Sequence, residues 1–286
     1  MGGLVFLMIR RCLLLLVVAI ALSGCTGFFF QPMKDYVVDP AKLGFTYEDV
    51  AFAAEDGTRL HGWFFQADGA RIGSVLFLHG NAENISTHFA NVAWLTRGGF
   101  DVFAIDYRGY GRSAGVPTLD GLHQDVTAAL DTLLKRPGVR PEEVVVFGQS
   151  LGGAVALTAI AANPEKDRLA GLVVEGAFSS YRGIAREKLG DFWLTWPFQW
   201  PISLTIDGRY DPLAAAAALS PLPLLIVQGQ ADQVVPPHHG EALYQAAAEP
   251  KAIWRPEAAG HIAAFANLAM QKRLQDYLTT LVDARE

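Results

Sequence analysis

The chain has 286 residues, a length that suits one large domain. Hydrophobic residues make up 51% of it and charged residues only 18%, which predicts a sizeable core and excludes a largely disordered chain. The formal net charge is −6 and no run of lysines and arginines occurs, so a nucleic-acid partner is not expected.

The N-terminus carries an apolar run that is typical of a signal peptide. Arg10 and Arg11 precede this run, which extends from Cys12 to Leu22. It is too short to cross a bilayer core of roughly 30 Å as a helix, but it has the length of a signal-peptide core. An uncleaved membrane anchor is the alternative interpretation.

The apolar run ends in the sequence LSGC, residues 22–25, which resembles the lipobox of bacterial lipoproteins. The resemblance implies that residues 1–24 are removed and that Cys25 is acylated, which gives a lipid anchor that holds the protein on a membrane. We therefore expect the protein in the bacterial cell envelope. Thr26, rather than an aspartate, after the cysteine favours the outer membrane over the inner one.

Residues 25–44 show no clear periodicity and are expected to form a lipidated tether. The domain that follows is expected to span residues 45–286. It opens with alternating residues on both sides of Asp56-Gly57, which is a strong short signal for a β-hairpin.

After the hairpin, strand-like and helix-like runs alternate along the chain. The strand-like runs are nearly all apolar, as expected when helices cover both faces of a sheet. This alternation predicts an α/β fold with a mostly parallel central sheet flanked by helices, and with an antiparallel hairpin at its start. The expected helices are Asn84–Thr96, Leu119–Lys135, Leu151–Ala162, Gly240–Ala248 and Ala263–Leu281.

The alternation is interrupted at residues 178–221, which we expect to form a small cap over the strand ends. Three of the six tryptophans lie there, and two phenylalanines stand close to them in the sequence. One hypothesis is that these rings line an acyl pocket or rest on lipid; the alternative is that they form ordinary core under the cap. The rings are Phe192, Trp193, Trp196, Phe198 and Trp200.

The sequence GQSLG at residues 148–152 stands between a predicted strand and a predicted helix. It lacks the Gly-Lys-Ser/Thr of a phosphate loop and the glycine spacing of a dinucleotide site, but it matches G-x-S-x-G. To expose its hydroxyl, Ser150 must adopt a strained backbone conformation, in which side chains at Gly148 and Gly152 would collide. We interpret Ser150 as a nucleophile; a tight turn with a hydrogen-bonded serine is the alternative.

A serine nucleophile needs a general base within hydrogen-bond reach. In the G-x-S-x-G arrangement the acid and then the histidine follow the serine along the chain. His261 lies between the last predicted strand and the last predicted helix, and is our candidate base. His238 and His239 follow two prolines at a helix start and are weaker alternatives.

The base in turn needs a carboxylate that fixes its tautomer. Asp232 lies in the loop after the strand-like run LPLLIVQG and is the candidate. Glu175, at the end of another predicted strand, is a competitor. Asp207 and Asp211 lie in the cap region and are more simply explained as helix caps or turn residues.

Two backbone amides are expected to form an oxyanion hole, where negative charge develops during acyl transfer. One is that of Leu151, directly after the nucleophile. The other is that of Asn81, in the loop after the strand-like run SVLFLHG. His79 precedes the serine in the chain, so we expect it to brace this loop rather than to act as a base.

In combination, the motifs LHGNAEN, DYRGYGRS, GQSLGG, GQADQVVP and GH, in this order, resemble the α/β-hydrolase superfamily from about Phe45 to Leu281. The residues of the first two motifs are most similar to those of a branch of membrane-associated, depalmitoylase-like hydrolases. The resemblance implies the α/β-hydrolase fold, a triad of Ser150, Asp232 and His261, and an oxyanion hole from Asn81 and Leu151. It implies no metal or organic cofactor, and the sequence contains no Cys/His cluster with metal spacing.

Within this superfamily, a serine nucleophile implies acyl transfer to water. We therefore predict a membrane-tethered serine hydrolase that cleaves small acyl esters or thioesters. An amidase or peptidase of the same fold is an alternative. A catalytically idle lipoprotein, which uses the fold as a binding module, is another. Arg108 is expected to pair with a buried carboxylate rather than to contact substrate.

Overall fold

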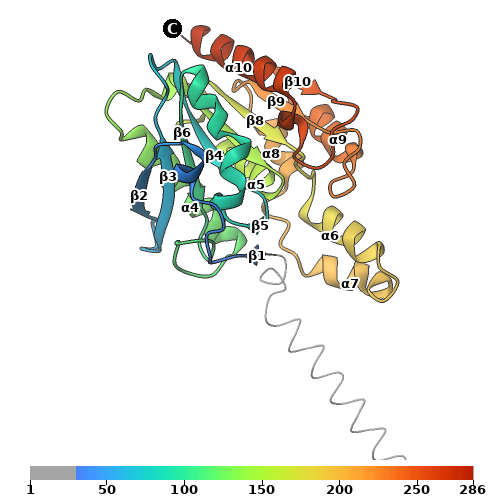
Figure 1. Cartoon of the computed structure of the whole chain (residues 1–286). Helices are drawn as coiled ribbons and strands as arrows, with labels where there is room; N and C mark the ends of the chain where they lie inside the picture. The colour runs from blue at the N-terminus through green and yellow to red at the C-terminus, as the bar shows by residue number, and fades with distance from the viewer. Residues whose placement is uncertain (1–29, 286) are drawn as a thin grey trace, which may run out of the picture.

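The structure, a computed structural model, describes residues 30–285. An eight-stranded sheet crosses the domain, in the order β2-β3-β6-β4-β7-β8-β9-β10 (Figure 1). Strand β3 pairs antiparallel with β2 and β6, and the remaining pairs are parallel. The strands are β2 (Glu48–Ala53), β3 (Arg59–Phe65), β4 (Gly73–Leu78), β6 (Phe100–Asp106), β7 (Val144–Gln149), β8 (Gly171–Glu175), β9 (Leu224–Val227) and β10 (Lys251–Trp254).

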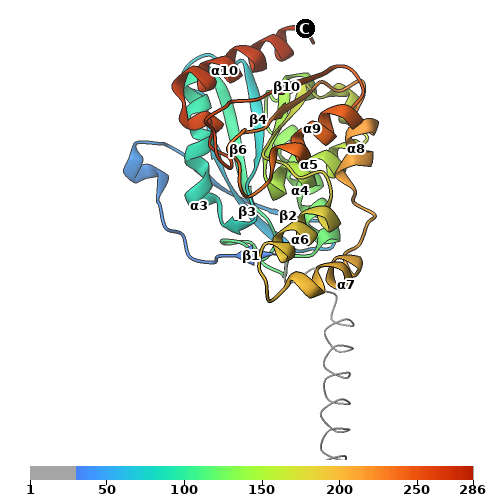
Figure 2. The same ribbon diagram turned by 90° about the vertical axis from the view of Figure 1, so that its right-hand side faces the viewer.

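Helices cover both faces of the sheet (Figures 1 and 2). Among residues 30–285, no helix is both long enough and apolar enough to cross a bilayer. One face carries α4 (Leu119–Leu134), α5 (Leu151–Ala161), α8 (Pro212–Ala218) and α9 (Pro237–Ala246). The other face carries α10 (Leu268–Asp283) and the short α3 (Ile85–His88) with the 3-10 turns Phe89–Asn91 and Ala93–Gly98.

Successive residues of the central strands enter opposite cores. In β4, Leu76 and Leu78 belong to the cluster under α4 and α5, whereas Val75 and Phe77 belong to the cluster under α10. All four side chains are fully buried. This two-sided burial is why the strands lack an apolar–polar alternation, and it confirms the predicted, mostly parallel sheet.

The predicted hairpin at Asp56-Gly57 joins β2 to β3. Gly57 has a φ of +80°, a left-handed conformation that glycine adopts without a steric penalty. The Asp56 carboxylate accepts a hydrogen bond from the Thr58 amide at 3.0 Å. The turn residues Asp56 and Gly57 therefore favour the antiparallel pairing of β2 with β3 at the start of the sheet.

The helix expected over Asn84–Thr96 is instead broken into one α-helical turn and two 3-10 turns. Asn84 caps the start of this segment, because its side chain accepts from the Ser86 amide at 2.9 Å. Beyond it, the hydroxyls of Thr87 and Thr96 donate to backbone carbonyls three residues earlier. Side chains that compete for backbone groups in this way weaken a regular helix.

The first described residues pack against the domain. Phe30 is buried, and β1 (Gln31–Pro32) pairs in parallel with β5 (Ala82–Glu83). The hydroxyl of Tyr36 donates to the buried carboxylate of Asp106. Contacts of the folded domain thus extend further towards the N-terminus than the expected boundary at residue 45. Residues 1–24, and Cys25 with the start of the expected tether, lie outside the described residues.

The interruption at residues 178–221 contains a helical hairpin, formed by α6 (Tyr181–Gly190), the 3-10 turn Trp196–Phe198 and α7 (Gln199–Leu204). This α6–α7 hairpin projects from the strand ends (Figures 1 and 2). The last part of the expected cap, α8, packs instead with α5 and α9 on the sheet. The protruding insertion is therefore smaller than the one expected from the sequence.

Candidate active site

Ser150 lies at the sharp turn between β7 and α5, with φ 53° and ψ −116°. A non-glycine residue at this φ is strained, and such strain persists only where its surroundings enforce it. The surrounding backbone packs tightly against this turn. A Cβ at Gly148 would lie 2.4 Å from the carbonyl oxygen of Gly152, and a Cβ at Gly152 would lie 2.2 Å from the carbonyl oxygen of Leu78. The two glycines let the turn approach the neighbouring backbone this closely.

The structure brings Ser150, His261 and Asp232 into one hydrogen-bonded line. Ser150 Oγ lies 3.0 Å from His261 Nε2, and His261 Nδ1 lies 2.8 Å from Asp232 Oδ2. The serine follows β7, the aspartate follows β9 and the histidine follows β10. Parallel strands present their carboxyl ends at one edge of the sheet, which is why residues 82 and 29 positions apart in the chain meet there.

Asp232 is held as an anion. Burial raises the pKa of its carboxyl group, but the hydrogen bond from His261 and those from the amides of Val235 and Val234 outweigh it, so the pKa stays below its ordinary value. A carboxylate only accepts hydrogen bonds, so the facing Nδ1 of His261 carries a proton. Nε2 of the neutral ring then presents its lone pair to the serine hydroxyl.

The carboxylate of Glu175, the competing acid, has other hydrogen-bond partners than His261. Its carboxylate accepts from the amide of Ala264 at 2.9 Å and from the side chain of Gln149 at 2.6 Å. Burial raises the pKa of Glu175 to about 7, against the lowering effect of these two donors. It links the strand end before Ser150 to the loop after His261, which suits a positioning residue.

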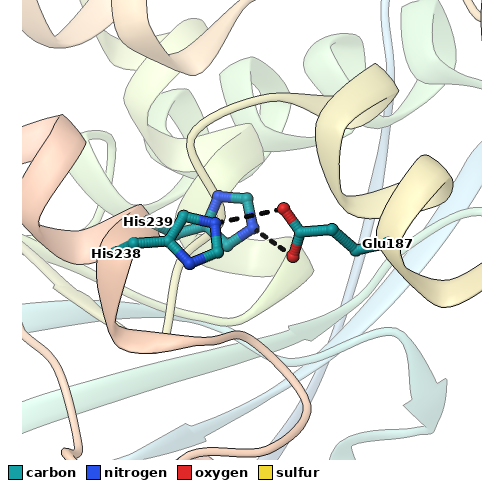
Figure 3. Close-up of side chains that lie close together, drawn as sticks. All are labelled: Glu187, His238 and His239. Carbon is teal, nitrogen blue, oxygen red and sulfur yellow. Dashed lines mark hydrogen bonds and ion pairs between the residues drawn. The ribbon is translucent and has the colours of Figure 1, made fainter. Parts of the chain in front are cut away.

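His238 and His239, the alternative bases, contact Glu187 of α6 rather than Ser150 (Figure 3). Their Nε2 atoms lie 3.1 and 3.2 Å from the two carboxylate oxygens. These three side chains are close enough together to hold a metal ion. However, His239 Nδ1 accepts a hydrogen bond from the amide of Ser179, so the proton of a neutral ring sits on Nε2. A metal at Nε2 would have to displace that proton. We therefore interpret the cluster as a structural contact that holds α6 against α9.

The loop expected to supply the second oxyanion amide lies against Ser150. A Cβ at Gly80 would be 3.6 Å from the Cβ of Ser150. His79 is fully buried, and burial lowers its pKa to about 4, so the ring is neutral. Its Nδ1 donates to the Gly80 carbonyl at 2.7 Å. That carbonyl belongs to the same peptide plane as the amide of Asn81, so His79 fixes the direction of the Asn81 N–H.

Asn81 is also held from its other side. The Tyr110 hydroxyl lies 2.8 Å from the Asn81 carbonyl oxygen, and the Asn81 side chain accepts from the amide of Gln31 at 3.3 Å. Leu151, which carries the other expected amide, is the first residue of α5. A helix N-terminus favours negative charge beside it.

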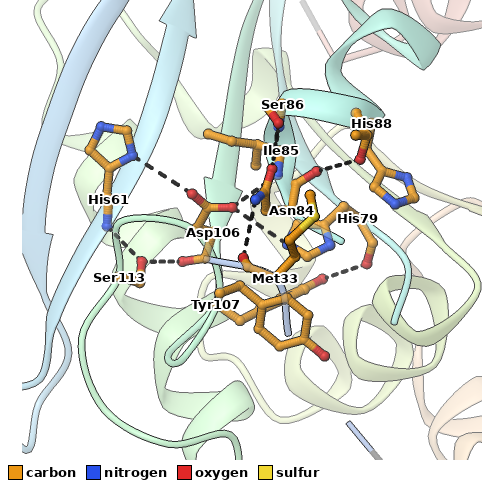
Figure 4. A network of polar contacts seen from close by, with 12 residues as sticks. Met33, His61, His79, Asn84, Ile85, Ser86, His88, Asp106, Tyr107 and Ser113 are labelled. Atoms are coloured by element: carbon orange, nitrogen blue, oxygen red, sulfur yellow. Dashed lines mark hydrogen bonds and ion pairs between the residues drawn. The ribbon is translucent and has the colours of Figure 1, made fainter. Parts of the chain in front are cut away.

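A network around Asp106 supports this loop (Figure 4). The buried Asp106 carboxylate accepts from the amide of Ile85 at 2.9 Å and from the hydroxyl of Tyr36. Asn84 donates to the carbonyl of Met33 at 3.1 Å. Tyr36 was not predicted at the site, because nothing in an aperiodic segment indicates that its hydroxyl reaches a strand end 70 residues away.

Arg108 is engaged within the protein, as expected. Its side chain is nearly buried, and Nε donates to Asp125 at 2.9 Å while Nη1 donates to Asp56 at 2.7 Å. Through these two hydrogen bonds, Arg108 connects α4, which carries Asp125, to the β2–β3 turn, which carries Asp56.

Comparison with known proteins places the chain among hydrolases. The Hydrolase_4 family model, described as serine aminopeptidase S33, matches residues 69–212. The uncharacterized protein YfhR of Escherichia coli K12 is 38% identical over 248 residues, covering 84% of this chain and 81% of YfhR. The α/β hydrolase domain-containing protein WAV2 of Arabidopsis thaliana is 34% identical over 229 residues, covering 75% and 71%.

Among solved structures, an esterase of Pyrococcus furiosus aligns with a TM-score of 0.68 over 90% of this chain and 97% of the esterase. The two sequences are 22% identical, so the match speaks for the fold alone. With the family match, it confirms the fold class expected from the sequence.

Proposed function

Since the chain belongs to the Hydrolase_4 family of α/β hydrolases, we propose that it is a serine hydrolase with Ser150, His261 and Asp232 as its catalytic triad. The observation that carries this proposal is the unbroken line of contacts from Ser150 Oγ through the imidazole to a buried carboxylate. A fold alone does not define an activity, whereas this geometry matches what acyl transfer needs.

In the acylation step, His261 Nε2 accepts the hydroxyl proton while Ser150 Oγ bonds to the carbonyl carbon of the substrate. The carbonyl electron pair moves onto oxygen, where the amides of Asn81 and Leu151 are proposed to donate hydrogen bonds. As the carbonyl re-forms, the bond to the leaving alcohol or thiol breaks, and that group takes the proton from Nε2. An acyl-enzyme remains on Ser150.

Water completes the cycle by the same route. It gives one proton to His261 Nε2 and adds to the acyl carbon, and the second intermediate then releases the carboxylic acid. Ser150 Oγ recovers its proton from the ring. In both steps Asp232 orients the ring and stabilises its positive charge, without taking the proton itself.

The proposed substrates are acyl esters or thioesters, as in the depalmitoylase-like branch that the sequence resembles. The P. furiosus neighbour is an esterase by its name, which supports ester chemistry on this fold. The apolar rings of the α6–α7 hairpin support an apolar acyl group, because they lie at the edge of the sheet that carries Ser150.

We propose that the protein is held on a membrane of the bacterial cell envelope, the outer one favoured, by acylation of Cys25. Each buried CH₂ group contributes about 0.8 kcal/mol, so two or three acyl chains would anchor it durably. Metabolic labelling with an alkyne fatty acid tests this: Cys25→Ser should abolish labelling and move the protein out of the membrane fraction. Retained labelling would contradict it.

A fluorophosphonate probe, which reacts with activated serines, tests the proposed triad. We expect the wild type to be labelled and Ser150→Ala to remain unlabelled. Ser179→Ala is a matched control, because Ser179 Oγ also contacts a histidine, 2.8 Å from His239 Nδ1, and should keep its labelling. A wild type that stays unlabelled would instead support an idle binding module.

An amidase or peptidase is the second candidate, because the matching family model is described as a serine aminopeptidase. The same triad can cleave either bond. Aminoacyl p-nitroanilides separate the two, because a peptidase cleaves both these amides and activated esters. We expect turnover of p-nitrophenyl acyl esters and none of the anilides. Anilide turnover that Ser150→Ala abolishes would assign the protein to the peptidase class.

A further inference from the structure

The α6–α7 hairpin exposes a ridge of large apolar side chains. Each is between 52% and 76% exposed, so the rings do not form core under the cap. Contiguous apolar surfaces of this kind usually mark a contact with something outside the folded chain. We call these residues the aromatic ridge: Phe192, Trp193, Leu194, Trp196, Phe198, Trp200 and Leu204.

The opposite face of the same hairpin is firmly attached. Tyr181, Ile184 and Ile206 are buried in the core cluster under α4 and α5. The side chain of Arg182 donates to the carbonyl of Ile206 at 2.8 Å, and Glu187 contacts the two histidines of α9. The ridge is therefore the outer surface of a packed element.

The start of the described chain lies at the same end of the molecule. In both views, β1 and α7 lie at that end, away from α10 (Figures 1 and 2). Cys25 precedes Phe30 by five residues, which extend to at most about 18 Å. If the apolar run up to Leu22 is instead an uncleaved anchor, eight residues give a reach of about 29 Å. With either attachment, the membrane lies close to this end.

We propose that the aromatic ridge docks on the surface of the lipid bilayer that holds the N-terminus, and that the enzyme takes esters or thioesters whose acyl chains lie in that bilayer. This inference rests on the proposed membrane attachment and hydrolase activity. Tryptophan rings prefer the interface between lipid tails and water. Cationic side chains of α6 accompany them. Arg186 lies over the ring of Trp200 at 4.1 Å, and Lys188 is exposed, with Asp191 as its ion-pair partner at 3.1 Å.

Docking in this position would bring the reactive serine towards lipid. Helix α6 begins six residues after the end of β8, and the residue after that strand, Gly176, borders His261. A Cβ at Gly176 would lie 3.2 Å from His261 Nδ1. The α6–α7 hairpin and the triad thus arise at the same edge of the sheet, so docking of the hairpin would turn that edge, with Ser150, towards the bilayer.

The docking is tested first without using activity, in full-chain Ser150→Ala protein reconstituted into phosphatidylcholine vesicles. Lipids brominated on their acyl chains quench tryptophans that enter the bilayer. We expect quenching in this protein and its loss when Trp193, Trp196 and Trp200 are all replaced by phenylalanine. The remaining three tryptophans, Trp63, Trp94 and Trp254, lie outside the hairpin. Quenching that is absent, or unchanged in the phenylalanine variant, overturns the proposal.

A second measurement uses the ratio of two activities. The probes are 4-methylumbelliferyl palmitate held in vesicles and the soluble 4-methylumbelliferyl acetate. We expect Trp193→Gln/Trp196→Gln to lower the palmitate-to-acetate ratio about tenfold, because less apolar surface holds the ridge on lipid. Leu268→Gln is the matched control, since Leu268 is 78% exposed but starts α10, and its ratio should not change.

Competing occupants give distinct outcomes. If the ridge pairs with a second copy, brominated lipid does not quench, and the glutamine variant shifts a dimer to a monomer in detergent; this result overturns docking on lipid. Failure of the hydrolase function is separate, since it appears as absent fluorophosphonate labelling while the quenching of the Ser150→Ala protein persists.

Discussion

Two regions flank Ser150, and they are built in opposite ways. On one side, the loop from His79 to Asn84 is buried at both ends, and the Tyr110 hydroxyl donates to the carbonyl of Asn81. Directly after the loop, the buried Asp106 carboxylate accepts from the Ile85 amide and from the Tyr36 hydroxyl. On the other side, the α6–α7 hairpin turns large rings towards solvent. The first region holds backbone amides in one geometry, and the second is the one for which we propose a contact outside the protein.

The difference predicts where substitutions matter. Removing one partner of a buried hydrogen bond costs about 1–3 kcal/mol, because the group left behind is neither solvated nor paired. An exposed ring that touches little can be replaced with almost no effect on folding. We therefore expect the loop side to control stability and turnover, and the hairpin side to control access to substrate.

The largest effect is expected from Gly152→Ala, where the nucleophile turn meets β4. The added Cβ would lie 2.2 Å from the Leu78 carbonyl oxygen and 2.5 Å from that of His79, both rigid backbone atoms. We expect a loss of about 3 kcal/mol in the free energy of unfolding, measured by urea denaturation. Gly260→Ala is the control, since its Cβ would meet nothing within 4 Å; equal losses in both variants would contradict the steric argument.

A pH-dependent effect of similar size is expected at Glu175, beneath the two regions. Its pKa is about 7 in the folded protein against 4.5 ordinarily, so the folded state retains a proton that the unfolded chain releases. The stabilisation is complete below pH 4.5 and is lost as the pH rises through 7, a fall of about 3 kcal/mol.

Urea titrations of the wild type and Glu175→Gln across this pH range measure that fall. The neutral amide cannot titrate, so the gap between the two proteins should change between pH 4.5 and 8. Parallel stability curves would show that folding does not raise the pKa of Glu175.

A smaller effect is expected from Tyr36→Phe, which removes the hydroxyl that donates to Asp106. We expect a loss of about 1–2 kcal/mol in stability. We also expect a roughly tenfold lower kcat, since the loop that carries Asn81 loosens. Tyr47→Phe is matched, because its hydroxyl contacts the exposed Asp39 at 3.3 Å and should change neither quantity. If the two variants behave alike, the N-terminal segment does not support the loop.

The smallest effect on folding is expected from Trp193→Gln on the ridge. The ring is 76% exposed, so the free energy of unfolding should change by less than about 0.5 kcal/mol in thermal or urea melts. A larger loss would mean that the ring packs against the hairpin, and would remove the contrast between the two regions.

The sequence predicted the parts whose signals are local. A few neighbouring residues are enough to indicate the conformation of three features: the turn at Ser150 with its glycines, the Asp56-Gly57 turn and the apolar strands. The sheet and the turn that carries Ser150 could therefore be inferred. The positions of Asp232 and His261 followed from the order of motifs along the chain. Their meeting is a property of strand order, which the alternation of elements limits strongly.

Other features depend on contacts between distant residues and had no local signal. The pairing of β1 with β5 joins two-residue segments 51 positions apart, too short for any periodicity. Composition could not decide whether the rings of the α6–α7 hairpin lie in the core or on the surface, because apolar residues occur in both places. The helix after Asn84 is broken where the hydroxyls of Thr87 and Thr96 compete for backbone carbonyls, and the apolar pattern of the segment gives no sign of this competition.

The parallel pairing of β1 with β5 has a mechanical consequence. Any pull applied through the N-terminus, whether from a membrane tether or from a fused reporter, enters the described domain at the buried Phe30 and at Gln31, whose amide donates a hydrogen bond to the Asn81 side chain. Strand β5, which directly follows Asn81, is among the first elements to bear that load. The opposite terminus, at the end of α10, lies far from it (Figure 1), and is the safer place to attach a tag or a surface.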